Sequence, residues 1–162
     1  MKVLIVCIVL AKLISKSIAN GYDVLEQIAA TGFYKSIAVF NKGNEDWILQ
    51  STIQLSHQYE LNCFVFNTSK LPIGHDTIIV LNKPGYEEFN LLFNQQNVQK
   101  SFTNTWLIFT PSSEAEISNF FNENQIKIGI NAILIFVQKF GSTDKLIQAH
   151  GMGSTKPQLQ VL

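Results

Sequence analysis

Arginine is absent from this chain of 162 residues, and its twelve basic residues are all lysine. Proteins that read nucleic acids or clamp phosphate groups rely on the bidentate guanidinium of arginine, so both functions are disfavoured. Twelve acidic residues balance the lysines to a formal net charge of zero, which provides no electrostatic attraction for DNA, RNA or an anionic membrane. No nucleic-acid partner is therefore expected.

Charged residues are also scarce, at 15% against the usual value of about a quarter, while 46% of the residues are hydrophobic. This is enough apolar surface for a folded core, so a wholly disordered chain is excluded. Only two cysteines occur, too few for a disulfide-stabilised miniprotein. No apolar run approaches the roughly twenty residues that a transmembrane helix needs. The length fits a single domain.

The N-terminus has the three-part pattern of a secretory signal peptide. A lysine precedes nine apolar residues, Val3–Ala11, and Ser17-Ile18-Ala19 places small residues before a cleavage point between Ala19 and Asn20. The alternative is a buried N-terminal strand, which the lysines soon after the apolar run disfavour. We therefore expect residues 1–19 to be a signal peptide and residues 20–162 to be an extracellular domain.

Cleavage would change both the charge and the cysteine content of the chain. It would remove three lysines and Cys7, and nine lysines against twelve acidic residues give a net charge of −3. Cys63 would then be the single cysteine, unable to form an internal disulfide. Its position in the middle of an expected strand favours a buried, inert thiol over intermolecular pairing. Asn67-Thr68-Ser69 is an N-glycosylation sequon at the end of that strand, which makes Asn67 the expected glycosylation site.

Short apolar runs alternate with amphipathic segments along the rest of the chain. Strands are expected at Lys35–Phe40, Leu61–Phe66, Thr77–Leu81 and Thr105–Phe109, followed by a β-hairpin of Ile128–Lys139 and Lys145–His150. Helices are expected over residues 20–31 and 45–58, after Pro84-Gly85, and after a Ser113-x-x-Glu116 capping box. The alternation predicts a layered α/β domain with a largely parallel sheet flanked by helices and a C-terminal β-hairpin.

The sequence contains no recognisable constellation for catalysis or metal binding. His57, His75 and His150 lie far apart, and neither HExxH nor CxxC occurs. No G-x-S-x-G nucleophile motif is present, and Gly151–Lys156 has the wrong residue order for a phosphate-binding loop. We therefore expect no catalytic residues, no metal and no cofactor, and a chain that is not an enzyme.

Residues 104–162 carry a series of features in a fixed order. They are the strand Thr105–Phe109, an acidic helix ending in Phe120-Phe121, Ile126–Ile130, the strand Ile133–Val137, Lys145–His150 and Pro157–Leu162. In these features the segment resembles the extracellular N-terminal region of arthropod ionotropic chemoreceptors, divergent relatives of ionotropic glutamate receptors. The second hairpin strand of that family commonly carries Glu-x-Tyr. This chain has Gln148 and His150 at those positions, so it does not meet that motif.

The resemblance implies the start of a receptor ectodomain that acts in chemosensory recognition or in assembly. Full-length members are ligand-gated cation channels with a two-lobed ligand domain and membrane spans, and this chain contains none of that machinery. It would be a truncated receptor, held at a membrane only through missing C-terminal segments. It would enter the secretory pathway and lie outside the cell, or at the cell surface as part of a longer receptor. The implied partners are other receptor subunits or ectodomains, while the small-molecule ligand and the ligand-binding residues stay open.

Two other functions stay open beside the receptor hypothesis. The first is a freestanding secreted α/β binding module without catalytic activity, which would engage a small ligand or another ectodomain at a sheet edge. The second is a soluble enzyme with a dispersed site, in which polar groups such as Asp76, His75 and Glu60 would converge. Membrane spans encoded beyond Leu162 would distinguish the receptor from the secreted module.

Overall fold

The computed structural model describes residues 21–40, 46–66, 76–82, 105–124, 133–140, 143–150 and 157–161. Within these ranges the helices are α2 (Gly21–Ala29), α3 (Asp46–Gln58) and α6 (Glu114–Glu123). The strands are β1 (Ser36–Phe40), β2 (Asn62–Phe66), β3 (Thr77–Asn82), β4 (Thr105–Thr110), β5 (Ile133–Phe140), β6 (Thr143–His150) and β7 (Gln158–Val161).

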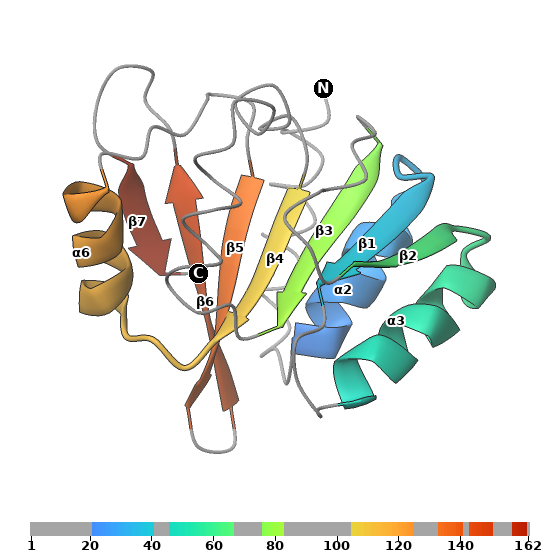
Figure 1. Ribbon diagram of the computed structural model, residues 1–162, viewed down its shortest axis with the longest axis horizontal. Coiled ribbons are helices and arrows are strands. Elements are labelled where there is room, and N and C mark those ends of the chain that lie inside the picture. Colours follow the sequence, from blue (N-terminus) through green and yellow to red (C-terminus); the bar gives the residue numbers. More distant parts are fainter. Residues whose placement is uncertain are drawn as a thin grey trace.

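All of these strands belong to one sheet of order β2-β1-β3-β4-β5-β6-β7 (Figure 1). The strands from β1 to β5 are parallel, β6 is antiparallel to β5, and β7 is antiparallel to β6. The inner parallel strands are rich in consecutive apolar residues because both of their faces are covered, and every residue of β3 is buried. The structure confirms the predicted α/β fold with its largely parallel sheet and C-terminal hairpin.

Alternate side chains along each strand enter two separate hydrophobic cores. On one face the sheet packs against Ile117, Phe120 and Phe121 of α6, and the rings of Phe121 and Phe136 meet edge-on at a centroid distance of 5.9 Å. On the other face Ile37, Val80 and Leu107 are among the strand residues that pack with α2 and α3. Figure 1 shows α6 beside β7, with α2 and α3 near β1 and β2.

The helix signals in the sequence are borne out where the structure describes them. Val24, Leu25, Ile28 and Ala29 of α2 are at most 2% exposed, as the predicted inward face requires. The capping box that starts α6 is complete, because the Ser113 hydroxyl accepts the Glu116 N–H and the Glu116 carboxylate accepts the Ser113 N–H.

Several predictions need correction. The described part of the first hairpin strand is Ile133–Phe140, residues 128–132 of the expected strand lie outside the described residues, and the two hairpin strands remain paired as far as Phe140 and Thr143. Strand β7, which pairs with β6, has no counterpart among the expected elements. Cys63 is only partly buried, since β2 lies at the edge of the sheet.

Other predictions lie outside the described residues. They are the signal peptide of residues 1–19 with its cleavage point between Ala19 and Asn20, the glycosylation site Asn67, the histidine His75, and the helix after Pro84. Within the described ranges, no helix is long and apolar enough to cross a membrane.

Candidate functional site at the carboxyl edge of the sheet

The order of the parallel strands reverses between β1 and β3. After β1 the chain moves outward through α3 to β2, and it then returns to the other side of β1 to form β3. The helix α3 lies on one face of the sheet, whereas α6, which connects β4 to β5, lies on the other. In open α/β sheets, ligands bind outside the carboxyl ends of the strands at such a reversal. The ends of β1, β3 and β4 therefore form the candidate site.

Asn82 is the last residue of β3 and lies at this edge. Its side chain shares the sheet face of Ile78 and Val80, the face that α2 and α3 cover, and the residue is only 6% exposed. No described residue donates a hydrogen bond to its Oδ1. A buried acceptor left without a donor costs about 1–3 kcal/mol. Buried polar atoms are almost always paired, so this amide calls for a functional explanation.

Two aromatic side chains form a wall beside Asn82. Phe109 of β4 is its register partner in the parallel ladder, so the two side chains leave the sheet on the same face. The indole of Trp47, in the first turn of α3, meets the Phe109 ring edge-on, with centroids 5.7 Å apart and an interplanar angle of 87°. Phe109 is 8% exposed, whereas Trp47 is 48% exposed. The indole of Trp47 is thus open to solvent and contacts Phe109, the register partner of Asn82.

The loop after β4 completes this edge, and its own groups satisfy one another. The Thr110 hydroxyl accepts the Ser112 N–H at 3.1 Å. The hydrogen bond from the Ser113 N–H to the Glu116 carboxylate, 2.6 Å long, lowers the pKa of Glu116. The capping box therefore satisfies the amides of Ser113 and Glu116 at the start of α6, which is a structural role.

The opposite, amino edge of the sheet carries a row of paired hydroxyl groups. Tyr34 and Thr105 share a hydrogen bond, as do Ser36 and Thr77, whose oxygens are 2.7 Å apart. Burial raises the pKa of Tyr34 despite its hydrogen bond to Thr105, so this phenol stays neutral at physiological pH. These groups satisfy one another and hold the strand starts in register.

Two of the residues considered for a dispersed enzyme site, Asp76 and Glu60, do not come together, and the third, His75, lies outside the described residues. Asp76 precedes β3 and Glu60 precedes β2, with β1 between them, so their backbones are roughly 10 Å apart. His57 lies in the last turn of α3 and is exposed. Among the residues that the structure describes, no three His, Cys, Asp or Glu side chains are grouped so that they could hold a metal ion.

The sequence did not predict that Asn82, Trp47 and Phe109 lie together at one edge of the sheet. The available signal was a polar residue at the end of a buried parallel strand, followed by Lys83-Pro84-Gly85. That signal marks a strand end but does not reveal that the amide stays unpaired. The contact between Trp47 and Phe109 joins residues 62 positions apart, and only the sheet order brings them together.

Comparisons with known proteins add little to this picture. No protein-family model and no curated protein matches the chain. One similar solved structure is a putative protein-L-isoaspartate O-methyltransferase from Plasmodium falciparum in complex with S-adenosyl-L-homocysteine. It has 9% sequence identity and a TM-score of 0.32, and the match covers 86% of this chain and 69% of that one.

The likeness to a methyltransferase contradicts the prediction that the chain is not an enzyme, and we withdraw that prediction. The likeness assigns no activity to this chain, because at this identity and TM-score it carries no residue correspondence. The site is therefore interpreted from its own chemistry.

Proposed function

We propose that this chain is a small-molecule recognition domain whose ligand binds at the carboxyl edge of the sheet, against Asn82. The observation that carries the proposal is the buried Oδ1 of Asn82, which no described residue satisfies. A ligand N–H or O–H group placed there would remove the cost of the unpaired acceptor. The strand order supports this location, because the edge includes the ends of β1 and β3, between which the order of the strands reverses.

The side chains at this edge define the chemical class of the ligand. Asn82, Phe109, Trp47 and Thr110 are all uncharged, and the charged groups described after β4 already have partners, Glu116 in the capping box and Glu114 with Lys145 at 3.1 Å. The exposed indole of Trp47 offers a flat apolar surface. Ligand sites typically combine such a surface with a few polar groups that fix orientation. The fitting ligand is a small, uncharged, flat molecule with a hydrogen-bond donor.

Binding of neutral heterocycles tests this proposal directly. Uracil, benzimidazole and nicotinamide each combine a flat ring with an N–H donor, and they can be titrated by calorimetry and by tryptophan fluorescence. We expect at least one to bind, and we expect Asn82→Leu to weaken that binding about tenfold, the equivalent of about 1.4 kcal/mol. Gln148→Leu is the matched control, because Gln148 is a buried amide on β6, away from this edge. Failure of all three probes to bind, or equal binding by Asn82→Leu, would contradict the proposal.

We propose further that this domain is the extracellular N-terminal part of an ionotropic-type chemosensory receptor, with a freestanding secreted binding module as the alternative. The described residues that carry the family resemblance fall on β4, α6, β5, β6 and β7, which are consecutive elements of the chain, while Ile126–Ile130 lies outside the described residues. Either role needs a ligand or partner surface on an α/β domain.

Sequencing the transcript beyond the codon for Leu162 separates these two roles. A continuing frame that encodes a second α/β lobe and hydrophobic spans is the result that the receptor role requires. A stop codon directly after Leu162 would exclude a channel for this product and leave the secreted module.

A further inference from the structure

Strand β2 forms one end of the sheet, and its outer backbone edge is open among the described residues. The Asn62 N–H donates to the Lys35 carbonyl at 2.9 Å, which directs the backbone groups of Asn62 toward β1. Because backbone groups alternate along a strand, Phe64 also faces β1, whereas Cys63 and Val65 direct their N–H and C=O groups outward. The backbone N–H and C=O groups of Cys63 and Val65 are thus available to pair with another strand.

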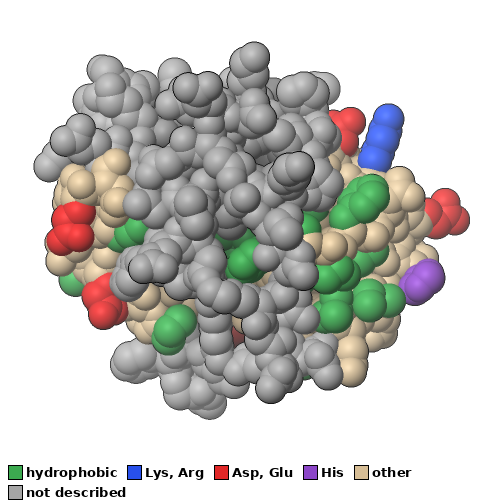
Figure 2. All heavy atoms as spheres, viewed as in Figure 1, with side chains coloured by type: hydrophobic (Ala, Val, Ile, Leu, Met, Phe, Trp, Pro, Cys, Tyr) green, Lys and Arg blue, Asp and Glu red, His purple; other side chains and the backbone are tan. Residues whose placement is uncertain are grey.

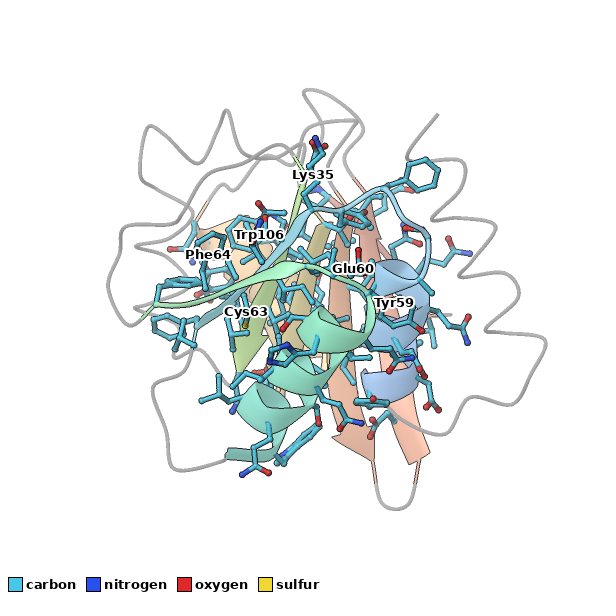
Figure 3. The ribbon with its side chains drawn as sticks, turned by 90° about the vertical axis from the view of Figure 1, so that its right-hand side faces the viewer. Lys35, Tyr59, Glu60, Cys63, Phe64 and Trp106 are labelled. Carbon is cyan, nitrogen blue, oxygen red and sulfur yellow. The ribbon has the colours of Figure 1, made fainter. Side chains whose placement is uncertain are left out.

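The side chains on this edge are apolar and exposed. Phe64 is 45% exposed and Val65 is 56% exposed, and they belong to opposite faces of the sheet. Figure 3 looks onto this edge and shows Cys63 and Phe64 on opposite sides of β2. Figure 2 shows exposed hydrophobic side chains on the side of the molecule where β2 lies.

Among the described residues, β2 lacks the charge, proline or bulge that often protects a terminal strand. Natural sheets place lysine, proline or a bulge on such strands to prevent pairing with other chains. The sequence Asn62-Cys-Phe-Val-Phe66 contains no charge and no proline, and its pairing with β1 is regular over all five positions. An unprotected edge in a protein of this size indicates a strand that has a partner.

We propose that β2 pairs antiparallel with β2 of a second copy of this chain, about a two-fold axis at Phe64. In this register Cys63 lies opposite Val65 of the second copy, and the outward groups of both form hydrogen-bonded pairs on each side of the axis. Phe64 lies opposite its own counterpart as the non-hydrogen-bonded pair, in which side chains approach most closely. In this register the outward N–H and C=O groups of Cys63 and Val65 all find partners across the two-fold axis.

A second copy fits this edge better than a charged partner strand. Self-pairing places identical residues near one another, which repels when they carry charge, and the five residues of β2 carry none. A partner strand with acidic or basic residues would find no opposite charge in β2. The pairing would also cover part of the exposed Phe64 and Val65 in both copies.

The other end of the sheet provides the competing arrangement. Strand β7 follows Pro157, has only four residues and exposes Val161 at 46%. Pairing of β2 with β7 of another copy would be heterologous and would continue into larger assemblies, whereas pairing about a two-fold axis closes at a dimer. The size of the assembly thus separates the two arrangements.

Sedimentation equilibrium on the full chain, across micromolar to millimolar concentrations, tests the proposal. We expect a monomer–dimer equilibrium, and we expect Val65→Lys to weaken dimerisation roughly 100-fold, because it places two like charges near the axis. Ile53→Lys is the matched control, since Ile53 is an exposed aliphatic residue on α3, and we expect it to leave the dimer unchanged. A monomer at all concentrations, an open series of larger species, or equal dissociation by both variants would overturn the proposal.

Amide hydrogen exchange on the wild-type chain gives a second measurement that does not depend on a folded variant. In the dimer the amides of Cys63 and Val65 are hydrogen-bonded to the second copy, so their exchange is expected to slow as concentration rises. Exchange at these two amides that is fast and independent of concentration would also overturn the proposal.

Discussion

Asn82 and Phe109 lie side by side as register partners at the carboxyl ends of β3 and β4, one a buried amide and the other a buried ring. The Phe109 ring meets the indole of Trp47 edge-on, whereas no described residue donates a hydrogen bond to the Asn82 amide oxygen. The apolar ring at this position is therefore packed, whereas the amide oxygen lacks a hydrogen-bond donor. Such a mismatch is expected where binding rather than stability has shaped a residue.

Replacing Asn82 by leucine is expected to stabilise the protein. The change removes an unpaired buried acceptor and keeps the branched shape and the number of side-chain heavy atoms, so the free energy of unfolding should rise by about 1–2 kcal/mol. Urea denaturation measures the difference. A loss of stability of similar size would mean that the amide is already paired within the protein, and the site would lose its main support.

Substitutions of Trp47 test its contact with Phe109 and its proposed contact with the ligand. Trp47→Ala removes the edge-on contact with Phe109, which is worth about 0.5–1.5 kcal/mol, and also removes the open ring from the site. Trp47→Phe keeps an aromatic ring at this position and is expected to retain most of the stability and the heterocycle binding. Trp106 is fully buried, so the fluorescence change on ligand binding should disappear in Trp47→Phe. A ligand-induced fluorescence change that persists in this variant would place the ligand elsewhere.

The capping box of α6 makes helix stability depend on pH. Ser113→Ala should destabilise the protein by about 1 kcal/mol, as for other N-cap residues. Hydrogen bonding from the Ser113 N–H lowers the pKa of Glu116 in the folded state, so this contribution is present above the unfolded-state pKa and is lost as pH falls through the folded-state pKa.

Thermal unfolding across the acidic range, compared between wild type and Glu116→Gln, reports this dependence. The wild type should lose more stability on acidification than the variant does. Parallel curves for the two proteins would show that the carboxylate does not take part in the cap.

Cys63 is expected to react slowly with alkylating reagents at neutral pH. Partial burial raises the pKa of its thiol, and the hydrogen bond with Ser56 opposes that rise without cancelling it. Iodoacetamide labelling followed by mass spectrometry should therefore speed up as pH increases above neutrality, because the thiolate is the reactive form. Ser56→Ala should slow the reaction at a given pH. Rapid labelling at neutral pH would contradict the raised pKa.

The alternation of apolar runs with amphipathic segments was sufficient to predict most of the described elements and the parallel sheet. This succeeded because strands such as Thr77–Asn82 are buried on both faces, which makes them continuous apolar runs. The capping box at Ser113 likewise depends only on residues three apart. Each of these features is local in sequence, which is why one sequence suffices to find them.

The strand order and the candidate site depend on long-range contacts and could not be predicted in the same way. Strand β7 consists of Gln158-Leu-Gln-Val161, which has a weak strand signal and exists as a strand through its pairing with β6. The partial exposure of Cys63 follows from the edge position of β2, which no local pattern reveals. The unpaired state of Asn82 depends on the groups around it in space, since an asparagine at a strand end is otherwise an ordinary turn residue.

The most direct measurement is an NMR titration of isotope-labelled protein with uracil, benzimidazole and nicotinamide, following the side-chain amide of Asn82 and the indole N–H of Trp47. The proposed site predicts that one probe shifts both signals together with a single dissociation constant, while the hydroxyl cluster around Tyr34 at the opposite edge stays unchanged. Shifts confined to the region of Tyr34, or no shift at Asn82 with any probe, would contradict ligand recognition at the carboxyl edge.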